Sequence, residues 1–327
     1  MKNRIDDNNH PQGSPKETSA ENSSFTLAGK LRDYLMLFKF SLNIMVVFSA
    51  VICFLLAPGL KQYVHPWLWS ILFCLGGFLV TGSANTINQI VEKDTDAKMK
   101  RTATRPIASG RMSEAEGWIV AVIAGVAGIW ILGTYFNWLS ARIALFSLFL
   151  YAFIYTPLKK VNSISVLVGA IPGALPCLIG WAAGNDSIFP GEHGVRDLGG
   201  WALFAIQFFW QFPHFWAIAL FRKREYAQAG FPMMPLVVGD DGTRWRSLAY
   251  TVAMVVVSLV PVYLGDLHLA YAVAACGLGG WFTWKVVHSL RGRDTSIDYG
   301  VFRASIAYLT LLFLFMLVDL ALPWGTT

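Results

Sequence analysis

Residues 67–90 read WLWSILFCLGGFLVTGSANTINQI, a stretch without a single charged side chain. A helix needs ~20 mostly apolar residues to cross the hydrocarbon core of a bilayer, so this stretch is long enough to span it. Its end is different in character, because Asn85, Asn88 and Gln89 precede the charged run EKDTDAKMKR at residues 92–101. The stretch therefore predicts a transmembrane helix that ends in a polar cluster at a membrane surface.

Further apolar runs of similar length fill most of the chain on both sides of this stretch. Of the 327 residues, 55% are hydrophobic and 14% are charged, whereas roughly 25% are charged in ordinary soluble domains. A soluble fold would need more charges to cover its surface. We therefore predict an all-α integral membrane protein with about nine transmembrane helices. The predicted spans are residues 35–58, 67–90, 117–135, 140–156, 164–183, 199–221, 247–264, 268–288 and 302–322.

The basic residues are distributed unevenly between the two sides of such a protein. The N-terminal segment and the loops after the second, fourth, sixth and eighth spans, together with the span ends that border them, hold 23 of the 26 Lys and Arg residues. The other side holds only Lys61, Arg142 and Arg196. Because Lys and Arg are enriched in cytoplasmic loops, the asymmetry predicts a cytoplasmic N-terminus. It also accounts for the net charge of +6 without a nucleic-acid partner, and none is expected.

The chain divides into a polar tail and one membrane domain. Residues 1–33 are mostly polar and aperiodic, which predicts a disordered cytoplasmic tail. Residues 34–323 are predicted to form a single transmembrane domain. The loops after the second and sixth spans are four spans apart and both combine acidic with basic residues. That spacing predicts two halves, at about 35–156 and 164–288, followed by a ninth helix.

The polar end of the second span carries the strongest chemical pattern. If the helix continues, five side chains share one face at helical spacing. They are Asn85, Asn88, Gln89, Glu92 and Asp96. Carboxylate and amide oxygens of this kind suit a hard cation such as Mg²⁺, which is commonly bound through one or two carboxylates and substrate phosphates.

A basic cluster follows this acidic face directly. Lys98 and Lys100 precede Arg101 and Arg105, and the two arginines are expected one helical turn apart. Arginine forks bind phosphate oxygens well. The pair of clusters therefore predicts a site for a metal-bridged diphosphate, and the alternative is a solvated cytoplasmic loop with incidental carboxylates.

The sixth span contains a second polar group. Gln211 and His214 are three residues apart and are expected on one helix face, with Pro213 between them. A neutral imidazole at this depth is either a hydrogen-bonded packing residue or a ligand for a metal or haem iron. Glu225, just after the span, offers a carboxylate for a second cation site.

At these residues the chain resembles the haem O synthase branch of the UbiA-like intramembrane prenyltransferases. The superfamily motif Asn-Asp-x-x-Asp-x-x-x-Asp matches Asn88-Gln89-x-x-Glu92-x-x-x-Asp96. Glu225 stands where the family usually has Asp, an exchange that keeps the carboxylate. Further fragments of the branch follow in order: Met99-x-Arg101-Thr102-x-x-Arg105-Pro106, Tyr155-Thr156-x-Leu158-Lys159, Gly173-Ala174-x-Pro176, Gly180-Trp181, Trp210-Gln211-x-Pro213-His214-Phe215 and Ala229-Gly230-x-Pro232-Met233.

The resemblance implies an activity, namely transfer of farnesyl from farnesyl diphosphate to haem b (protohaem IX), with water, to give haem O and diphosphate. Haem b is then a substrate rather than a cofactor, and Mg²⁺ acts through the substrate diphosphate. The implied metal ligands are Asn88, Glu92, Asp96 and Glu225. The implied catalytic residues are Glu92, Asp96, Arg101 and Arg105, and the implied substrate contacts are Asn85, Asn88, Lys159, Gln211, His214 and Glu225.

Two other functions compete with this interpretation. A UbiA-like enzyme could act on a quinone precursor or another acceptor, and the segment Gln211-x-Pro213-His214-Phe215 argues against it, because the relatives are expected to carry Asp residues there. A membrane haem chaperone or a transporter also fits a multi-span chain. A transporter should place its polar groups near the midplane, and a chaperone has no need of the carboxylates.

The resemblance also implies surroundings and partners. It places the protein in the cell (cytoplasmic or inner) membrane, with the site loops on the cytoplasmic side. The lipid bilayer, a haem A synthase and cytochrome oxidase assembly factors are the expected partners. The length of the isoprenoid depends on packing that the sequence does not display.

Overall fold

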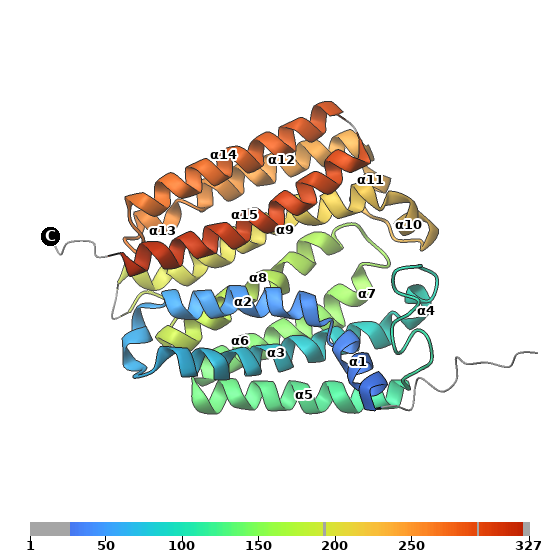
Figure 1. The fold of residues 1–327 in the computed structure, drawn as a ribbon, viewed down its shortest axis with the longest axis horizontal. Coiled ribbons are helices and arrows are strands. Elements are labelled where there is room, and N and C mark those ends of the chain that lie inside the picture. Colours follow the sequence, from blue (N-terminus) through green and yellow to red (C-terminus); the bar gives the residue numbers. More distant parts are fainter. Residues whose placement is uncertain (1–26, 192–193, 293, 323–327) are drawn as a thin grey trace, which may run out of the picture.

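The computed structural model describes residues 27–191, 194–292 and 294–322, and these are folded almost entirely as helices (Figure 1). The only β pairing among them is an isolated bridge between Gly191 and Gly194. The long helices are α1 (Leu27–Leu37), α2 (Phe40–Leu56), α3 (Pro66–Val91), α5 (Glu114–Tyr135), α6 (Trp138–Phe149), α8 (Ser165–Asn185), α9 (Gly199–Phe221), α12 (Gly239–Val257), α14 (Leu269–Gly292) and α15 (Thr295–Ala321). The short elements are η2 (Pro58–Gln62), α4 (Lys93–Asp96), η3 (Leu150–Tyr155), α7 (Thr156–Leu158), η4 (Val195–Leu198), α10 (Lys223–Gln228), α11 (Met234–Val237) and α13 (Val260–Tyr263).

Every predicted span coincides with a helix or with a series of consecutive helices, so the all-α membrane fold is confirmed. Seven helical segments of the described chain are long and apolar enough to cross a bilayer. An eighth results if α1 and α2, which meet at an angle of 51°, count as one broken span. The helix α14 is long but less apolar, because it ends in Lys285, His288 and Arg291. The count of nine spans therefore stays a prediction.

The first part of the chain differs from its prediction. Residues 27–33 were expected in a disordered tail, but they form the first turns of α1. Asp33 is buried there and pairs with Arg111, at 2.9 Å between Nη2 and Oδ1. Lys30 pairs with Glu116 in the same way, at 3.0 Å. The tail prediction was wrong for these residues because polar side chains can fold against a charged loop. The rest of the predicted tail lies outside the described residues.

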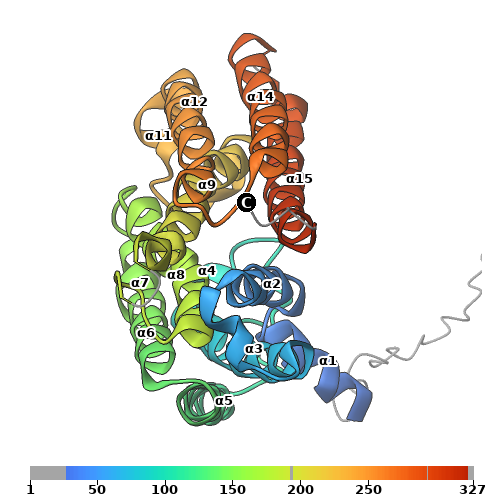
Figure 2. The same cartoon turned by 90° about the vertical axis from the view of Figure 1, so that its left-hand side faces the viewer.

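The long helices pack as two groups that lie side by side (Figure 2). In the first group α2, α3, α5 and α6 follow one another, and α8 closes it by packing on α2 and α6. In the second group α9 packs on α12 and α15, and α14 packs on α12 and α15. The contacts of α8 with α9 and of α2 with α15 join the groups. The proposed division into repeat halves stays a prediction.

Close contact between α2 and α8 depends on small residues. A side-chain carbon added at Gly180 would lie 2.0 Å from the carbonyl oxygen of Ala50, and one at Gly184 would lie 2.6 Å from Cβ of Ala57. This Gly-x-x-x-Gly spacing is typical of membrane helices whose backbones approach closely. This close contact holds α8, the helix that closes the first group, directly against α2.

Gly180→Ala is expected to destabilise the protein by about 1–3 kcal/mol, because overpacking forces helices apart. The measurement is the melting temperature of the purified protein in detergent. Gly277→Ala is the matched control, since a side-chain carbon at Gly277 in α14 would meet nothing within 4 Å. An unchanged melting temperature for Gly180→Ala would contradict the close approach.

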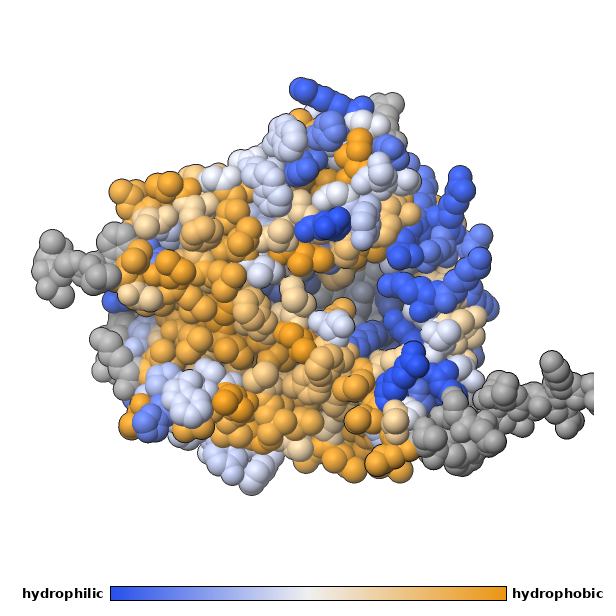
Figure 3. Space-filling model, viewed as in Figure 1, coloured by the Kyte–Doolittle hydropathy of each residue, from blue (hydrophilic) through white to orange (hydrophobic). Residues whose placement is uncertain are grey.

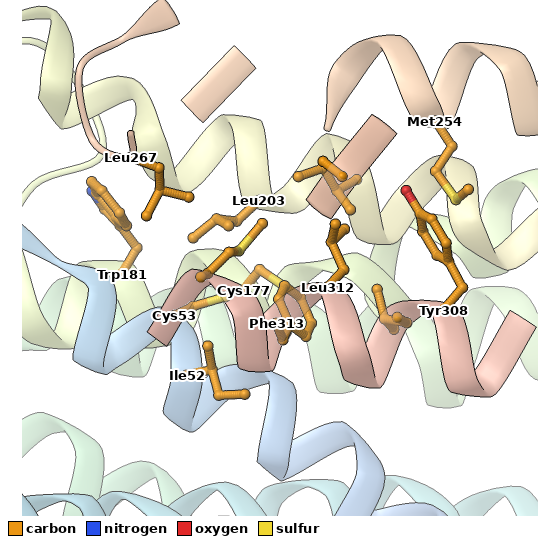
Figure 4. Close-up of a cluster of buried hydrophobic side chains, with 14 of the residues drawn as sticks. Ile52, Cys53, Cys177, Trp181, Leu203, Met254, Leu267, Tyr308, Leu312 and Phe313 are labelled. Atoms are coloured by element: carbon orange, nitrogen blue, oxygen red, sulfur yellow. The ribbon is translucent and has the colours of Figure 1, made fainter. Parts of the chain in front are cut away.

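A large apolar core lies between α2, α8, α9, α14 and α15 (Figure 4). Trp181, Tyr271, Tyr308 and Phe282 are among its fully buried side chains. This core fixes α9 and α15 against the first group of helices.

The short elements and the polar surface gather at one end of the bundle. The elements α4, α7, α10 and α11 lie together at this end, beside α1 (Figure 1). The space-filling view shows hydrophilic residues concentrated at the same end, and a broad apolar surface over the rest of that face (Figure 3). The polar ends of the second and sixth predicted spans therefore meet at one end of the protein.

Candidate active site

The polar face of α3 is buried in the folded protein. Asn85, Asn88 and Gln89 are each 1% exposed, Glu92 is 2% exposed and Asp96 is 1% exposed. The helix α3 ends at Val91, Glu92 follows with non-helical backbone angles (φ −101°, ψ 6°), and the four-residue helix α4 comes next. Asn85, Asn88 and Gln89 lie on α3 as predicted, but Glu92 and Asp96 lie beyond its end. Charges and amides at this depth require partners within the fold, and the role of the five side chains as one site stays a prediction.

Two of the amides hold the bend between α1 and α2. The Nδ2 of Asn85 donates to the carbonyl of Phe38 at 3.3 Å. The Nε2 of Gln89 donates to the carbonyls of Met36 and Leu37 at 3.0 and 2.8 Å. The carbonyl of Met36 also accepts from the backbone N–H of Lys39, at 3.1 Å, where the chain turns. Asn85 and Gln89 therefore donate hydrogen bonds to backbone carbonyls at the break between α1 and α2.

The bend presents a lysine to the cluster. Lys39 adopts φ 48°, a left-handed conformation that is uncommon outside glycine. Its Nζ donates to the Oδ1 of Asn88 at 2.8 Å. The Nδ2 of Asn88 donates to the Oγ1 of Thr156 at 3.3 Å. The side chain of Asn88 is thus fixed from both sides.

Both carboxylates of the cluster are paired with cations. The Nζ of Lys159 lies 2.6 Å from the Oε1 of Glu92, and the Nη1 of Arg105 lies 2.6 Å from the Oδ2 of Asp96. The Oδ1 of Asp96 is buried and has no hydrogen-bond partner among the described residues. A buried carboxylate oxygen in this state suits a hard cation, so the donor set fits Mg²⁺.

The helix before Lys159 is widened into a π-helical turn. Both the backbone N–H and the hydroxyl of Thr156 reach the carbonyl of Tyr151, five residues earlier. Pro157 follows directly and lacks an N–H to continue the α-helical ladder. Such turns are frequent at functional sites. Here the turn positions Thr156 and Lys159 beside the end of α3.

Two loops meet near Lys159: the first loop, residues 92–113 after α3, and the second loop, residues 222–238 after α9. The second loop reaches Lys159 through Phe231. The Nζ of Lys159 lies 5.7 Å from the ring centres of Tyr155 and Phe231. Phe231 follows α10 and is 3% exposed. Burial lowers the pKa of Lys159, but Tyr155, Glu92 and Tyr226 raise it by more, so the pKa lies above its ordinary value. Lys159 therefore remains a cation where the two loops meet.

The two arginines do not form the expected helical pair. Residues 97–112 form turns instead of a continued helix. Arg105 pairs with Asp96, whereas Arg101 is exposed and has no ion-pair or hydrogen-bond partner within the described ranges. The prediction of arginines one turn apart was wrong, because α4 ends at Asp96. Arg101 stays a proposed substrate contact.

Gln211 and His214 face different helices. The Nε2 of Gln211 donates to the carbonyl of Ala170 in α8 at 2.9 Å. The Nδ1 of His214 lies 2.8 Å from the Oγ of Ser305 in α15. Both residues lie three positions apart in the continuous helix α9, as predicted, but their partners differ, because α9 lies between α8 and α15. His214 stays a proposed haem contact, and Gln211 binds the backbone of α8.

Glu225 does not join the buried carboxylates. Its Oε1 pairs with the Nη1 of Arg222 at 2.6 Å within its own loop, and its side chain is 38% exposed. Among the described residues, no three Asp, Glu, His or Cys side chains come close enough to hold a metal ion by themselves. The role of Glu225 as a metal ligand therefore stays a prediction.

An apolar cavity of about 100 Å³ opens beside the cluster between α2, α3, α6 and α8. Asn85 and Tyr151 are polar residues in its wall, and the wall otherwise is mainly aliphatic, with Val47, Gly77 and Ile179 among its residues. The cavity therefore connects the polar cluster with the apolar interior of the bundle.

Sequence reasoning missed several residues of the site. Lys39, Thr156, Tyr226 and Phe231 contact the cluster residues or lie close to them. A lysine at the start of an apolar span was a usable signal for Lys39. Thr156 stood in the family fragment Tyr155-Thr156-x-Leu158-Lys159 but was given no role. Tyr226 and Phe231 carried no signal, because their placement depends on the fold of the loop after α9.

Comparison with known proteins agrees with this geometry. The model of the UbiA prenyltransferase family matches residues 46–324. The chain is 39% identical over 307 residues to the protoheme IX farnesyltransferase of Flavobacterium johnsoniae, covering 92% of this chain and 98% of that protein.

Solved structures share the fold. A digeranylgeranylglyceryl phosphate synthase is similar with a TM-score of 0.72 and 18% identity, covering 89% of this chain and 98% of that chain. A UbiA homologue from Archaeoglobus fulgidus bound to GPP and Mg²⁺ is similar with a TM-score of 0.67 and 14% identity, covering 89% and 100%. The chain is thus a multi-pass integral membrane protein that belongs to the UbiA prenyltransferase family of prenyl-transferring enzymes.

Proposed function

We propose that this enzyme transfers a farnesyl group from farnesyl diphosphate to haem b and, with water, produces haem O and diphosphate. The observation that carries the proposal is a pair of buried, cation-paired carboxylates, Glu92 and Asp96, beside an apolar cavity. The choice of haem b is supported by the 39% identity to a protein named protoheme IX farnesyltransferase.

The polar cluster would bind the diphosphate. Asn88, Glu92 and Asp96 would hold Mg²⁺, with Glu225 as a further proposed ligand, and Mg²⁺ would supply Lewis-acid neutralisation of the diphosphate charge. The homologue bound to GPP and Mg²⁺ supports this assignment. Lys159 and Arg105 already lie at the carboxylates and would turn toward the phosphate oxygens, while the exposed Arg101 would close over them.

The prenyl tail would lie in the apolar cavity. Its wall contains Asn85 at the polar cluster and Gly77 deeper in α3. The buried walls exclude water from the allylic carbon until the acceptor reacts. The farnesyl C–O bond breaks, and the terminal vinyl carbon of haem b forms a bond to the farnesyl C1. Water then adds to the neighbouring vinyl carbon and loses a proton.

Gly77→Leu is expected to favour a shorter prenyl donor by about tenfold, because a missing or added group in an apolar pocket changes discrimination by this order. A side-chain carbon at Gly77 would meet Val47 at 3.6 Å, an ordinary contact, so the fold tolerates the start of a side chain there. The measurement is the ratio of turnover with farnesyl and geranyl diphosphate. Gly280→Leu in open space is the control, and an unchanged ratio in Gly77→Leu would place the tail elsewhere.

The acceptor would approach α9, where His214 would contact haem and Gln211 would keep α9 on α8. We place the protein in the cell membrane with its N-terminus and site loops on the cytoplasmic side, as the distribution of Lys and Arg indicates. A haem A synthase and cytochrome oxidase assembly factors are the proposed protein partners.

Turnover by membranes that contain the full chain tests the proposal. They are supplied with haem b, farnesyl diphosphate and Mg²⁺, and the extracted pigments are analysed by mass spectrometry. The expected product is a haem heavier by one farnesyl group and one hydroxyl group, because the added water loses a proton. Unchanged haem b, with turnover of an aromatic or quinone-precursor acceptor in parallel membranes, would overturn the haem assignment and retain prenyl transfer.

A further inference from the structure

The imidazole of His214 is held on three sides. It stacks on Trp210, with ring centres 4.6 Å apart and an interplanar angle of 25°. Phe302 of α15 lies 5.0 Å from it. The Nδ1 faces the Oγ of Ser305 at 2.8 Å. These contacts fix the plane of the ring, and the partners of Ser305 then decide which ring nitrogen carries the proton.

The hydrogen bonds of Ser305 determine which nitrogen carries the proton. A serine hydroxyl has one proton to donate and two lone pairs that accept. The Oγ of Ser305 lies 2.6 Å from the carbonyl oxygen of Phe302, which can only accept. The hydroxyl of Ser305 therefore donates its proton to the carbonyl oxygen of Phe302. The Oγ must accept from His214, so the proton of the neutral imidazole lies on Nδ1.

Ser305 is itself held firmly. It is 0% exposed, and its carbonyl accepts a hydrogen bond from the Nε1 of Trp210 at 2.6 Å. Trp210 thus binds the backbone of Ser305 and stacks on the ring that Ser305 orients. The serine, the tryptophan and the histidine form one unit across the contact between α9 and α15.

The other ring nitrogen is left with a free lone pair. Within the described part of the chain, no residue hydrogen-bonds to the Nε2 of His214. Fully buried polar atoms without a partner form a separate group, and Nε2 does not belong to it. A histidine whose Nδ1–H is held by an acceptor is the usual arrangement for an Nε2 metal ligand, since the bond fixes the tautomer and raises the basicity of the ring.

We propose that Ser305 is a positioning residue that fixes His214 as the Nδ1-protonated tautomer and thereby presents Nε2 as an axial ligand to the iron of the haem acceptor. This inference rests on the proposed function, because it takes haem as the acceptor. Ser305 touches neither the haem nor the diphosphate, and it acts only through His214.

The test is a haem titration of the purified full chain in nanodiscs, with Fe(III) protoporphyrin IX as the probe. The readouts are the Soret band and the electron paramagnetic resonance signal of the iron. The wild type is expected to give a histidine-ligated spectrum that His214→Ala loses. Ser305→Ala is expected to weaken haem binding about tenfold or more, as loss of a partner behind a metal ligand does, and to reduce the histidine-ligated fraction.

Two variants separate this role from a structural one. Ser305→Thr keeps a hydroxyl that can donate to Phe302 and accept from His214, so it should restore the wild-type spectrum. Ser49→Ala is the matched control, because Ser49 is buried and donates to the carbonyl of Val46 at 2.8 Å with no histidine behind it. Its spectrum should equal that of the wild type.

The outcomes distinguish the inference from the proposed function. A Ser305→Ala protein with wild-type haem affinity and spectrum would overturn the role of Ser305. A histidine-ligated spectrum that survives His214→Ala would overturn it as well. In either case, farnesylated haem in the turnover assay would leave the proposed function intact. No haem binding by the wild type, with no farnesylated haem in the turnover assay, would instead overturn the proposed acceptor.

Discussion

Asp96→Asn is expected to lower the rate of prenyl transfer by about 100- to 1,000-fold, the loss seen when one preorganised electrostatic group is removed from an active site. Asp96 is 1% exposed, and its Oδ1 has no hydrogen-bond partner among the described residues. The substitution keeps the shape of the side chain but removes the charge that would bind Mg²⁺. The measurement is kcat for farnesyl diphosphate over a range of Mg²⁺ concentrations.

Asp94→Asn is the matched control for this substitution. Asp94 lies in the same short helix, α4, but is exposed. The Asp94→Asn protein should therefore retain wild-type turnover. The melting temperature of Asp96→Asn reports whether Arg105, which loses its counter-charge, disturbs the fold. A folded Asp96→Asn protein with wild-type kcat and Mg²⁺ dependence would remove Asp96 from the catalytic site.

The membrane fold was predictable because its signal is repeated along the chain. Each span is an uncharged or nearly uncharged run of residues. In the hydrocarbon core of a bilayer, a helix satisfies the backbone hydrogen bonds of such a run within the run itself. The bend at Lys39 was not predictable in the same way. It interrupts an apolar run without proline or glycine, and the carbonyls at the bend accept hydrogen bonds from Asn85 and Gln89, which lie about fifty residues further along the chain.

The site was predictable where it lies on one helix and unpredictable where it depends on two. Asn85, Asn88 and Gln89 share α3, as helical spacing predicted, whereas Glu92 and Asp96 lie beyond its end and depend on the turn between α3 and α4. Helical spacing did not predict the partners of His214 and Gln211, because α9 packs between α8 and α15 and each side chain contacts a different neighbour. A shared face of a central helix does not indicate a shared partner.

Lys159 explains why the two loops meet at this point. It pairs with Glu92 at the end of α3, and its ammonium group lies near Phe231 of the second loop. Because the pKa of Lys159 is raised above its ordinary value by Tyr155, Glu92 and Tyr226 against the effect of burial, the ion pair is present at neutral pH. On the alkaline side, the contribution of Lys159 to stability is lost as the pH rises through that raised pKa.

Lys159→Met is therefore expected to lower prenyl transfer about 100-fold, since it removes a cation from the place where charge develops on the departing diphosphate. Lys160→Met is the matched control, because Lys160 is exposed and its Nζ donates to the carbonyl of Val91, at 2.9 Å, with no carboxylate partner among the described residues. The measurement is kcat with farnesyl diphosphate at a saturating Mg²⁺ concentration.

The loss of Lys159 leaves Glu92 buried without its counter-charge, and such a break can cost about 3–5 kcal/mol of stability. Lys159→Arg separates the two effects, because it keeps the charge that pairs with Glu92 and is expected to fold and to retain part of the activity. If Lys159→Met unfolds, the comparison moves to Lys159→Gln at low temperature, with folding checked by the melting curve. A folded neutral variant with wild-type kcat would show that Lys159 serves only the junction of the two loops, and the charge on the leaving diphosphate would then have to be met by Arg105 and the metal alone.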